Sequence, residues 1–149
     1  MPRRELKYPH QVEDWLKEFG RSLTVAGTLT LIGSGALLWH AAQQGIETPL
    51  PENSMDVDPI TDSDEVARLC YDAIIGSDFE RTHGWHVNLM PDAVLREFPA
   101  GWEGRAAKQG YGLLQVTVLS PADLLVPKLR RGEPRDHAHA AWAKSVNLV

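Results

Sequence analysis

The stretch Thr28-Leu-Thr-Leu-Ile-Gly-Ser-Gly-Ala-Leu-Leu38 constrains the fold of this chain most strongly. Residues 28–32 alternate threonine with apolar residues and include a β-branched isoleucine, which is typical of a strand. Gly33-Ser34-Gly35 then permits a tight turn, and the good helix formers that follow end at Gly45. A strand that passes directly into a helix predicts a sheet with helices packed against its faces.

The rest of the chain continues this alternation of helices and strands. Apolar residues at steps of three and four predict an amphipathic helix over about residues 9–23. We therefore predict an α/β (α+β) fold, a mixed sheet flanked by helices, in one domain over residues 1–149 with its core at about 28–145. Further strands are expected at Met55–Ile60, Trp85–Met90 and Tyr111–Leu119. Further helices are expected from a cap within Thr61–Glu65 to Gly76, after Ser120 and over about Arg135–Val146. The segment Asp92–Lys108 is expected to form a long and only partly ordered connection.

Composition limits the function classes that fit the chain. Its 149 residues are 43% hydrophobic and 23% charged, as in soluble globular proteins, and the net charge is −5. Contact with nucleic acid would therefore need a local basic cluster, such as Lys128–Arg135, for which a solvated face is the alternative interpretation. We see neither a signal peptide nor a membrane span, so we expect a cytoplasmic protein. The single cysteine, Cys70, is expected in the core.

Two aspartates, Asp56 and Asp58, flank one valine in the expected strand Met55–Ile60. Side chains two positions apart in a strand point to the same face, so the two carboxylates would lie together and repel each other. A divalent cation removes this conflict, and Mg²⁺ prefers such oxygen ligands completed by waters and substrate phosphates. The alternative is a solvated turn, since Asp, Asn, Ser and Pro all favour turns.

The turn at Gly33-Ser34 suits the binding of an anion. Glycines allow close approach of a ligand, the amides at the start of a helix are free to donate, and the Ser34 hydroxyl adds a donor. The alternative is a turn that packs a helix closely on the sheet. Together with Asp56 and Asp58, this phosphate cradle indicates a nucleotidyl or phosphoryl transferase.

At these residues the chain resembles a known family. Gly33-Ser34 with the following helix, and Asp56-x-Asp58, are similar to the Gly-Ser and Asp-x-Asp signature of the nucleotidyltransferase superfamily, which has the polymerase-β-like fold. The later segment Leu119–Leu125, followed by Lys128 and Arg135-Asp136, resembles the AbiEii-type nucleotidyltransferases. Those proteins occur as toxins of toxin–antitoxin and phage-defence systems.

The resemblance implies a function for each of these residues. Asp56 and Asp58 would hold Mg²⁺, and Gly33 and Ser34 would bind the β,γ-phosphates of an NTP substrate. The acceptor would be an RNA 3′ end, such as that of tRNA, or a protein hydroxyl, and a cognate antitoxin would be a partner. Lys128 and Arg135 would bind phosphate, and Asp136 would accept the proton of the attacking hydroxyl or orient Lys128 or Arg135.

Some positions differ from the family pattern. Glu52 stands where an arginine often precedes the aspartates, with Ser54 in place of a threonine. Asn88 stands where many members have a third carboxylate, for which Asp92 and Asp136 are the candidate substitutes. These differences favour an alternative, a degenerate and non-catalytic nucleotidyltransferase-fold protein that binds a partner. A phosphate-binding regulatory module without transfer chemistry is a third hypothesis.

His137 and His139 suggest a zinc site, but in a helix residues two apart point about 200° away from each other. We therefore exclude this pair as a zinc site. Trp39 and Trp142 fit helix faces and are expected in the core rather than stacked on a base.

Overall fold

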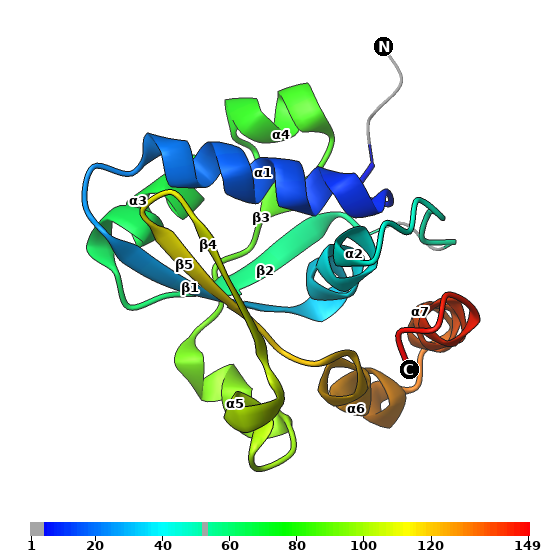
Figure 1. The fold of residues 1–149 in the computed structure, drawn as a ribbon. Helices are drawn as coiled ribbons and strands as arrows, with labels where there is room; N and C mark the ends of the chain where they lie inside the picture. Colours follow the sequence, from blue (N-terminus) through cyan, green and yellow to red (C-terminus); the bar gives the residue numbers. More distant parts are fainter. Residues whose placement is uncertain (1–4, 52–53) are drawn as a thin grey trace.

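A mixed sheet forms the centre of the computed structural model, which describes residues 5–51 and 54–149 (Figure 1). Within these residues the sheet has five strands in the order β3-β2-β1-β5-β4. The central strand β1 pairs in parallel with β5 and antiparallel with β2, while β2 pairs in parallel with β3. The strands are β1 (Gly27–Ile32), β2 (Asp56–Ile60), β3 (His86–Val87), β4 (Ala107–Tyr111) and β5 (Leu114–Val118).

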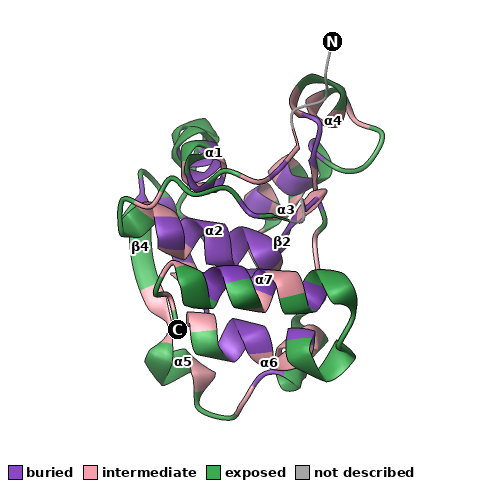
Figure 2. Ribbon diagram, turned by 90° about the vertical axis from the view of Figure 1, so that its right-hand side faces the viewer, coloured by how far each residue is buried: buried purple, intermediate pink, exposed green. Residues whose placement is uncertain are grey.

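Helices connect and cover these strands. Figure 2 shows α2 almost wholly buried, with α6 and α7 lying together beside it. The helices are α1 (Pro9–Ser22), α2 (Gly33–Gln43), α3 (Asp64–Tyr71), α4 (Asp78–His83), α5 (Trp102–Arg105), α6 (Pro121–Arg131) and α7 (Pro134–Ser145), and a 3₁₀ helix, η1, covers Asp92–Glu97. The prediction of a mixed sheet flanked by helices is confirmed.

The two faces of the sheet differ in polarity. Leu29, Leu31 and Val57 are buried on the face that α1 and α2 cover, and Gly35 of α2 lies so close to β2 that an added Cβ would stand 3.3 Å from Val57. Asp56 and Asp58 are the neighbours of Val57 on β2, and they project to the opposite, partly exposed face because side chains alternate along a strand. At the start of β2, Val57 therefore faces the apolar core on one side of the strand, and the two aspartates lie on the other side.

The strand predicted over Tyr111–Leu119 is present as β5 over Leu114–Val118, but Tyr111 belongs to a preceding strand, β4, that was not predicted. The chain forms a hairpin, in which β4 and β5 pair antiparallel from Ala107↔Val118 to Tyr111↔Leu114. Gly112 sits in the turn with φ of 58°, a left-handed conformation that glycine adopts without a steric cost. The chain therefore reverses its direction at the turn that contains Gly112, between β4 and β5.

Other segments differ in extent from the prediction. The predicted strand Trp85–Met90 is reduced to His86–Val87. The excursion at Asp92–Lys108 contains η1 and α5 and already enters β4. Helix α4 was not predicted, although Ser77 caps its start by accepting a hydrogen bond from the Glu80 amide and Gly84 ends it with φ of 84°.

The predictions for buried residues are confirmed. Cys70, Trp39 and Trp142 all belong to the hydrophobic core. Burial raises the pKa of the Cys70 thiol to about 12, so it stays protonated and behaves as an apolar residue. None of the helices in residues 5–51 and 54–149 combines the length and apolar character that a membrane span requires.

Candidate functional site

Among the residues that the structure describes, two hollows are considered as candidate ligand sites. The larger one, of about 830 Å³, lies between α1 and α4 and is lined by aromatic residues that include Trp15, Phe79 and Trp85. The smaller one, of about 270 Å³, is lined by residues that include Gly33, Ser34, Asp56, Asp58, Asn88, Lys128, Arg131 and Arg135. We call the smaller hollow the carboxylate pocket and place the functional site there, because the residues predicted from the sequence to bind metal and phosphate line it.

Asp58 is the more enclosed of the two aspartates in the carboxylate pocket. An added Cβ on Gly33 would stand 2.4 Å from Asp58 Oδ2, so only a glycine at position 33 leaves room for this carboxylate. Asn88 Nδ2 donates to Asp58 Oδ1 over 3.2 Å. Burial raises the pKa of Asp58 to about 7, and the negative charge of Asp56 contributes in the same direction. In the absence of a bound cation, the pocket therefore disfavours the state in which both carboxylates are ionised.

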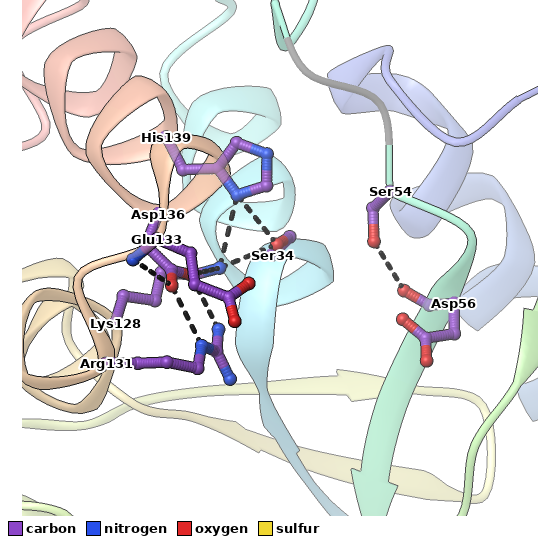
Figure 3. Close-up of polar contacts among 8 residues, drawn as sticks. All are labelled: Ser34, Ser54, Asp56, Lys128, Arg131, Glu133, Asp136 and His139. Atoms are coloured by element: carbon purple, nitrogen blue, oxygen red, sulfur yellow. Dashed lines mark hydrogen bonds and ion pairs between the residues drawn. The ribbon is translucent and has the colours of Figure 1, made fainter.

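Asp56 is more open, with 34% of its side chain exposed. The hydroxyl of buried Ser54 donates a hydrogen bond to the backbone oxygen of Asp56 over 3.1 Å, and this contact fixes the start of β2 (Figure 3). His86, its neighbour on β3, has Nε2 4.0 Å from Asp56 Oδ2 and Nδ1 2.8 Å from Glu80 Oε2. The edge strand thus holds an imidazole between Asp56 and a carboxylate of α4.

A second group of side chains comes from α2, α6 and α7. Lys128 Nζ donates to Ser34 Oγ over 2.9 Å, and His139 Nδ1 lies 3.1 Å from this oxygen and 3.2 Å from Nζ (Figure 3). All three side chains are buried. Burial lowers the pKa of Lys128 to about 8, against the opposing effect of Asp136. A buried cation and a hydroxyl donor are therefore held together at the turn between β1 and α2.

Asp136 lies behind Lys128 and does not line the carboxylate pocket. Its two oxygens accept hydrogen bonds from Arg131 over 2.6 and 2.8 Å, and Oδ1 is 3.9 Å from Lys128 Nζ. Oδ2 also accepts from the Glu133 amide over 3.3 Å, which caps α7. This geometry suits the orientation of Lys128 better than the acceptance of a proton from a substrate. Arg135 is exposed and lines the pocket.

Comparison with known proteins identifies the family. A family model described as a nucleotidyltransferase of unknown function (DUF6036) matches residues 11–147. The chain belongs to this family. No curated protein and no solved structure matches the chain.

The aspartate pair has the chemistry of ligands for a divalent cation such as Mg²⁺. The two carboxylates share one face of β2, and a bound cation would oppose the burial and the charge of Asp56 that raise the pKa of Asp58. Among residues 5–51 and 54–149, no group of three or more Asp, Glu, His or Cys side chains forms a larger metal centre. Such a site leaves the remaining coordination positions to water or substrate phosphates, as Mg²⁺ commonly requires.

The structure brings most of the predicted site residues of the chain together. Gly33, Ser34, Asp56, Asp58, Lys128 and Arg135 line one pocket. Asn88 stands beside Asp58 as expected of the third position, whereas Asp92 is exposed and does not line the pocket. Glu52 lies outside the described residues.

The contact of His139 with Ser34 and Lys128 was not predicted from the sequence. His139 was considered only as a partner of His137, which is exposed. The spacing of Asp136 and His139 contained a usable signal, because residues three apart share a helix face. Both are buried and approach Lys128, at 3.9 and 3.2 Å.

We expect Asp136→Asn to lower the free energy of unfolding at neutral pH by about 2 kcal/mol, because a buried carboxylate loses charged hydrogen bonds to a half-exposed arginine. The pKa of Asp136 is held down at about 2, mainly by Arg131, so its stabilising effect is present above its unfolded value near 3.8 and is lost as pH falls. Urea unfolding at several pH values should show the difference between the two proteins narrowing below about pH 4. Exposed Asp14→Asn is the control, and equal stability of Asp136→Asn and the unmodified protein at pH 7 would contradict this assignment.

Proposed function

We propose that this protein is a Mg²⁺-dependent nucleotidyltransferase that transfers NMP from an NTP to a hydroxyl group. One observation carries the proposal: the paired carboxylates of Asp56 and Asp58 share a pocket of about 270 Å³ with Gly33, Ser34 and Lys128. The pocket thus combines ligands for a divalent cation with donors for phosphate oxygens. The family to which the chain belongs supports the same class of reaction.

In this proposal, residues on one side of the pocket bind the metal ion and residues on the other side bind the phosphates. Asp56 and Asp58 would hold Mg²⁺, which when bound neutralises phosphate charge and favours displacement at the α-phosphate. On the other side, the Ser34 hydroxyl and the Lys128 ammonium donate to the oxygens of the β- and γ-phosphates. Arg135 at the open rim adds positive charge toward the same groups.

In the transfer, the acceptor oxygen forms a bond to the α-phosphorus. The bond from that phosphorus to the bridging oxygen breaks, pyrophosphate leaves, and the hydroxyl proton passes to solvent in the open pocket. Asp136 acts indirectly, since both its oxygens are bound to Arg131 and it faces Lys128 from behind. Its function in the proposal is to keep Lys128 in place.

The resemblance to AbiEii-type proteins extends this proposal. On that basis the acceptor is an RNA 3′ end, such as that of tRNA, or a protein hydroxyl, and the protein is the toxin of a toxin–antitoxin or phage-defence system in the cytoplasm with a cognate antitoxin. Three basic residues of α6 and α7, Lys128, Arg131 and Arg135, are compatible with an RNA acceptor, because they give an otherwise acidic chain local positive charge at the pocket.

Calorimetric titration of each NTP, with Mg²⁺ and with EDTA, tests the proposal. We expect binding of at least one NTP that depends on Mg²⁺, followed by transfer of label from the α-³²P form of that NTP to RNA or protein. Binding without transfer to any acceptor would favour a regulatory phosphate-binding module. Absence of NTP binding would favour the degenerate, partner-binding alternative, which Asn88 in place of a third carboxylate already suggests.

A further inference from the structure

His139 is the most buried member of the group that it forms with Ser34 and Lys128. Its exposed fraction is 1%, and its Nδ1 atom, the Ser34 hydroxyl and the Lys128 ammonium form a triangle with sides of 2.9, 3.1 and 3.2 Å. Ser34 and Lys128 line the carboxylate pocket, whereas His139 does not. Figure 3 shows the imidazole on α7 with its Nδ1 atom directed at the other two groups.

The chemistry of the three groups determines how their hydrogen atoms are arranged. An ammonium group only donates, so the His139 Nδ1 atom that faces Lys128 accepts. The imidazole is then neutral with its proton on Nε2. Nδ1 has one lone pair, and two donors, Lys128 and Ser34, lie within reach of it.

This competition has a consequence for the pocket. When Lys128 donates to Nδ1 and to the Ser34 oxygen, the hydroxyl hydrogen of Ser34 has no lone pair left on Nδ1. It is then available to an acceptor in the carboxylate pocket. A phosphate group supplies several such acceptor oxygens.

We propose that His139 is a positioning residue that directs the Ser34 hydroxyl and the Lys128 ammonium toward the phosphate groups of the nucleotide. The inference rests on the proposed function, because it assumes that the ligand of the pocket carries phosphates. His139 itself touches no substrate. It acts by accepting a hydrogen bond from Lys128 on the side away from the pocket.

Two substitutions of similar shape test this function. His139→Asn places Oδ1, an acceptor, near the position of Nδ1, while His139→Leu removes the acceptor and keeps a side chain of similar size. The probe is inorganic pyrophosphate at constant Mg²⁺, followed by calorimetry. We expect His139→Leu to weaken binding about tenfold, the loss of about one charged hydrogen bond, and His139→Asn to stay within about threefold of the unmodified protein.

His137→Leu is the matched control, since His137 lies on the same helix and is exposed. It should bind pyrophosphate like the unmodified protein. Equal affinity of the Leu and Asn variants at position 139 would overturn the proposal, whether both retain binding or both lose it while folded. Failure of the unmodified protein to bind pyrophosphate would overturn it as well.

A measurement on the unmodified protein covers the case in which the variants do not fold. Nitrogen-15 NMR of the histidine ring should show the proton of His139 on Nε2 and a change of the Nδ1 resonance when pyrophosphate is added. A proton on Nδ1, or no change on addition of pyrophosphate, would overturn the proposal.

These results separate the inference from the proposed function. If pyrophosphate binding follows the acceptor at position 139 but no label is transferred, His139 keeps its assignment and the transferase function fails. If label is transferred but the Leu and Asn variants behave alike, the transferase function stands and the assignment of His139 fails. In a steady-state assay we expect His139→Leu to raise KM for the NTP more than it lowers kcat.

Discussion

Asp58→Asn is expected to lower nucleotidyl transfer at least about 10³-fold, equivalent to about 4 kcal/mol of transition-state stabilisation. The substitution keeps the shape of the side chain but removes half of the charge that the aspartate pair offers to Mg²⁺. The amide also brings a donor to a position next to Asn88 Nδ2, which itself donates to Asp58. Transfer of ³²P label and calorimetric binding of NTP with Mg²⁺ should both decrease.

The stability of Asp58→Asn distinguishes loss of function from loss of fold. Because burial raises the pKa of Asp58 to about 7, the ionised carboxylate costs free energy in the folded protein without a cation. We therefore expect the variant to unfold at the same urea concentration as the unmodified protein or at a higher one. Asp92→Asn, an exposed aspartate outside the pocket, should keep full activity. Full turnover of Asp58→Asn would refute the assignment of the metal ligands.

The second large effect is expected for Gly33→Ala. The added Cβ would stand 2.4 Å from Asp58 Oδ2, closer than any real contact, and a φ of 77° is unfavourable for alanine. Since Gly33 begins α2 and Asp58 lies on β2, either the turn or the carboxylate has to move. We expect Mg²⁺-dependent NTP binding to weaken at least about 100-fold, or about 2.7 kcal/mol, as measured by calorimetry.

Gly45→Ala provides a matched control for the effect of the backbone. Gly45 has φ of 70°, close to that of Gly33, but an added Cβ meets nothing within 4 Å. Both variants should therefore lose a similar free energy of unfolding, about 1–2 kcal/mol, from strain in the left-handed conformation. Only Gly33→Ala should lose nucleotide binding. If both variants bind nucleotide equally well, contact between Gly33 and Asp58 does not shape the site.

The elements that could be predicted from the sequence are those whose structure depends on residues close together in the chain. The alternation over 28–32, the glycine turn and the helix after it correspond to β1 and α2. The spacing of Asp56 and Asp58 placed both on one face of β2, since a strand has a side-chain period of two.

The features that were not predicted depend on a single turn residue or on distant contacts. Gly112 lies in the turn that separates β4 from β5, and the sequence pattern predicted β5 but not the strand β4 before the turn. The position of His139 against Ser34 depends on how α7 packs beside α2 and α6. The sequence did contain a helix-capping pattern for α4, because Ser77 is followed three residues later by Glu80.

The contact between Ser34 and His139 joins residues 105 positions apart, and it bears on when the protein becomes able to bind its ligand. During synthesis the strand with both aspartates leaves the ribosome well before α6 and α7 exist. Domains acquire such long-range contacts late, because the cost of closing the loop precedes the gain from the contact. The nascent chain therefore completes its anion-binding group only when α7 docks, so that ligand binding reports a late step of folding.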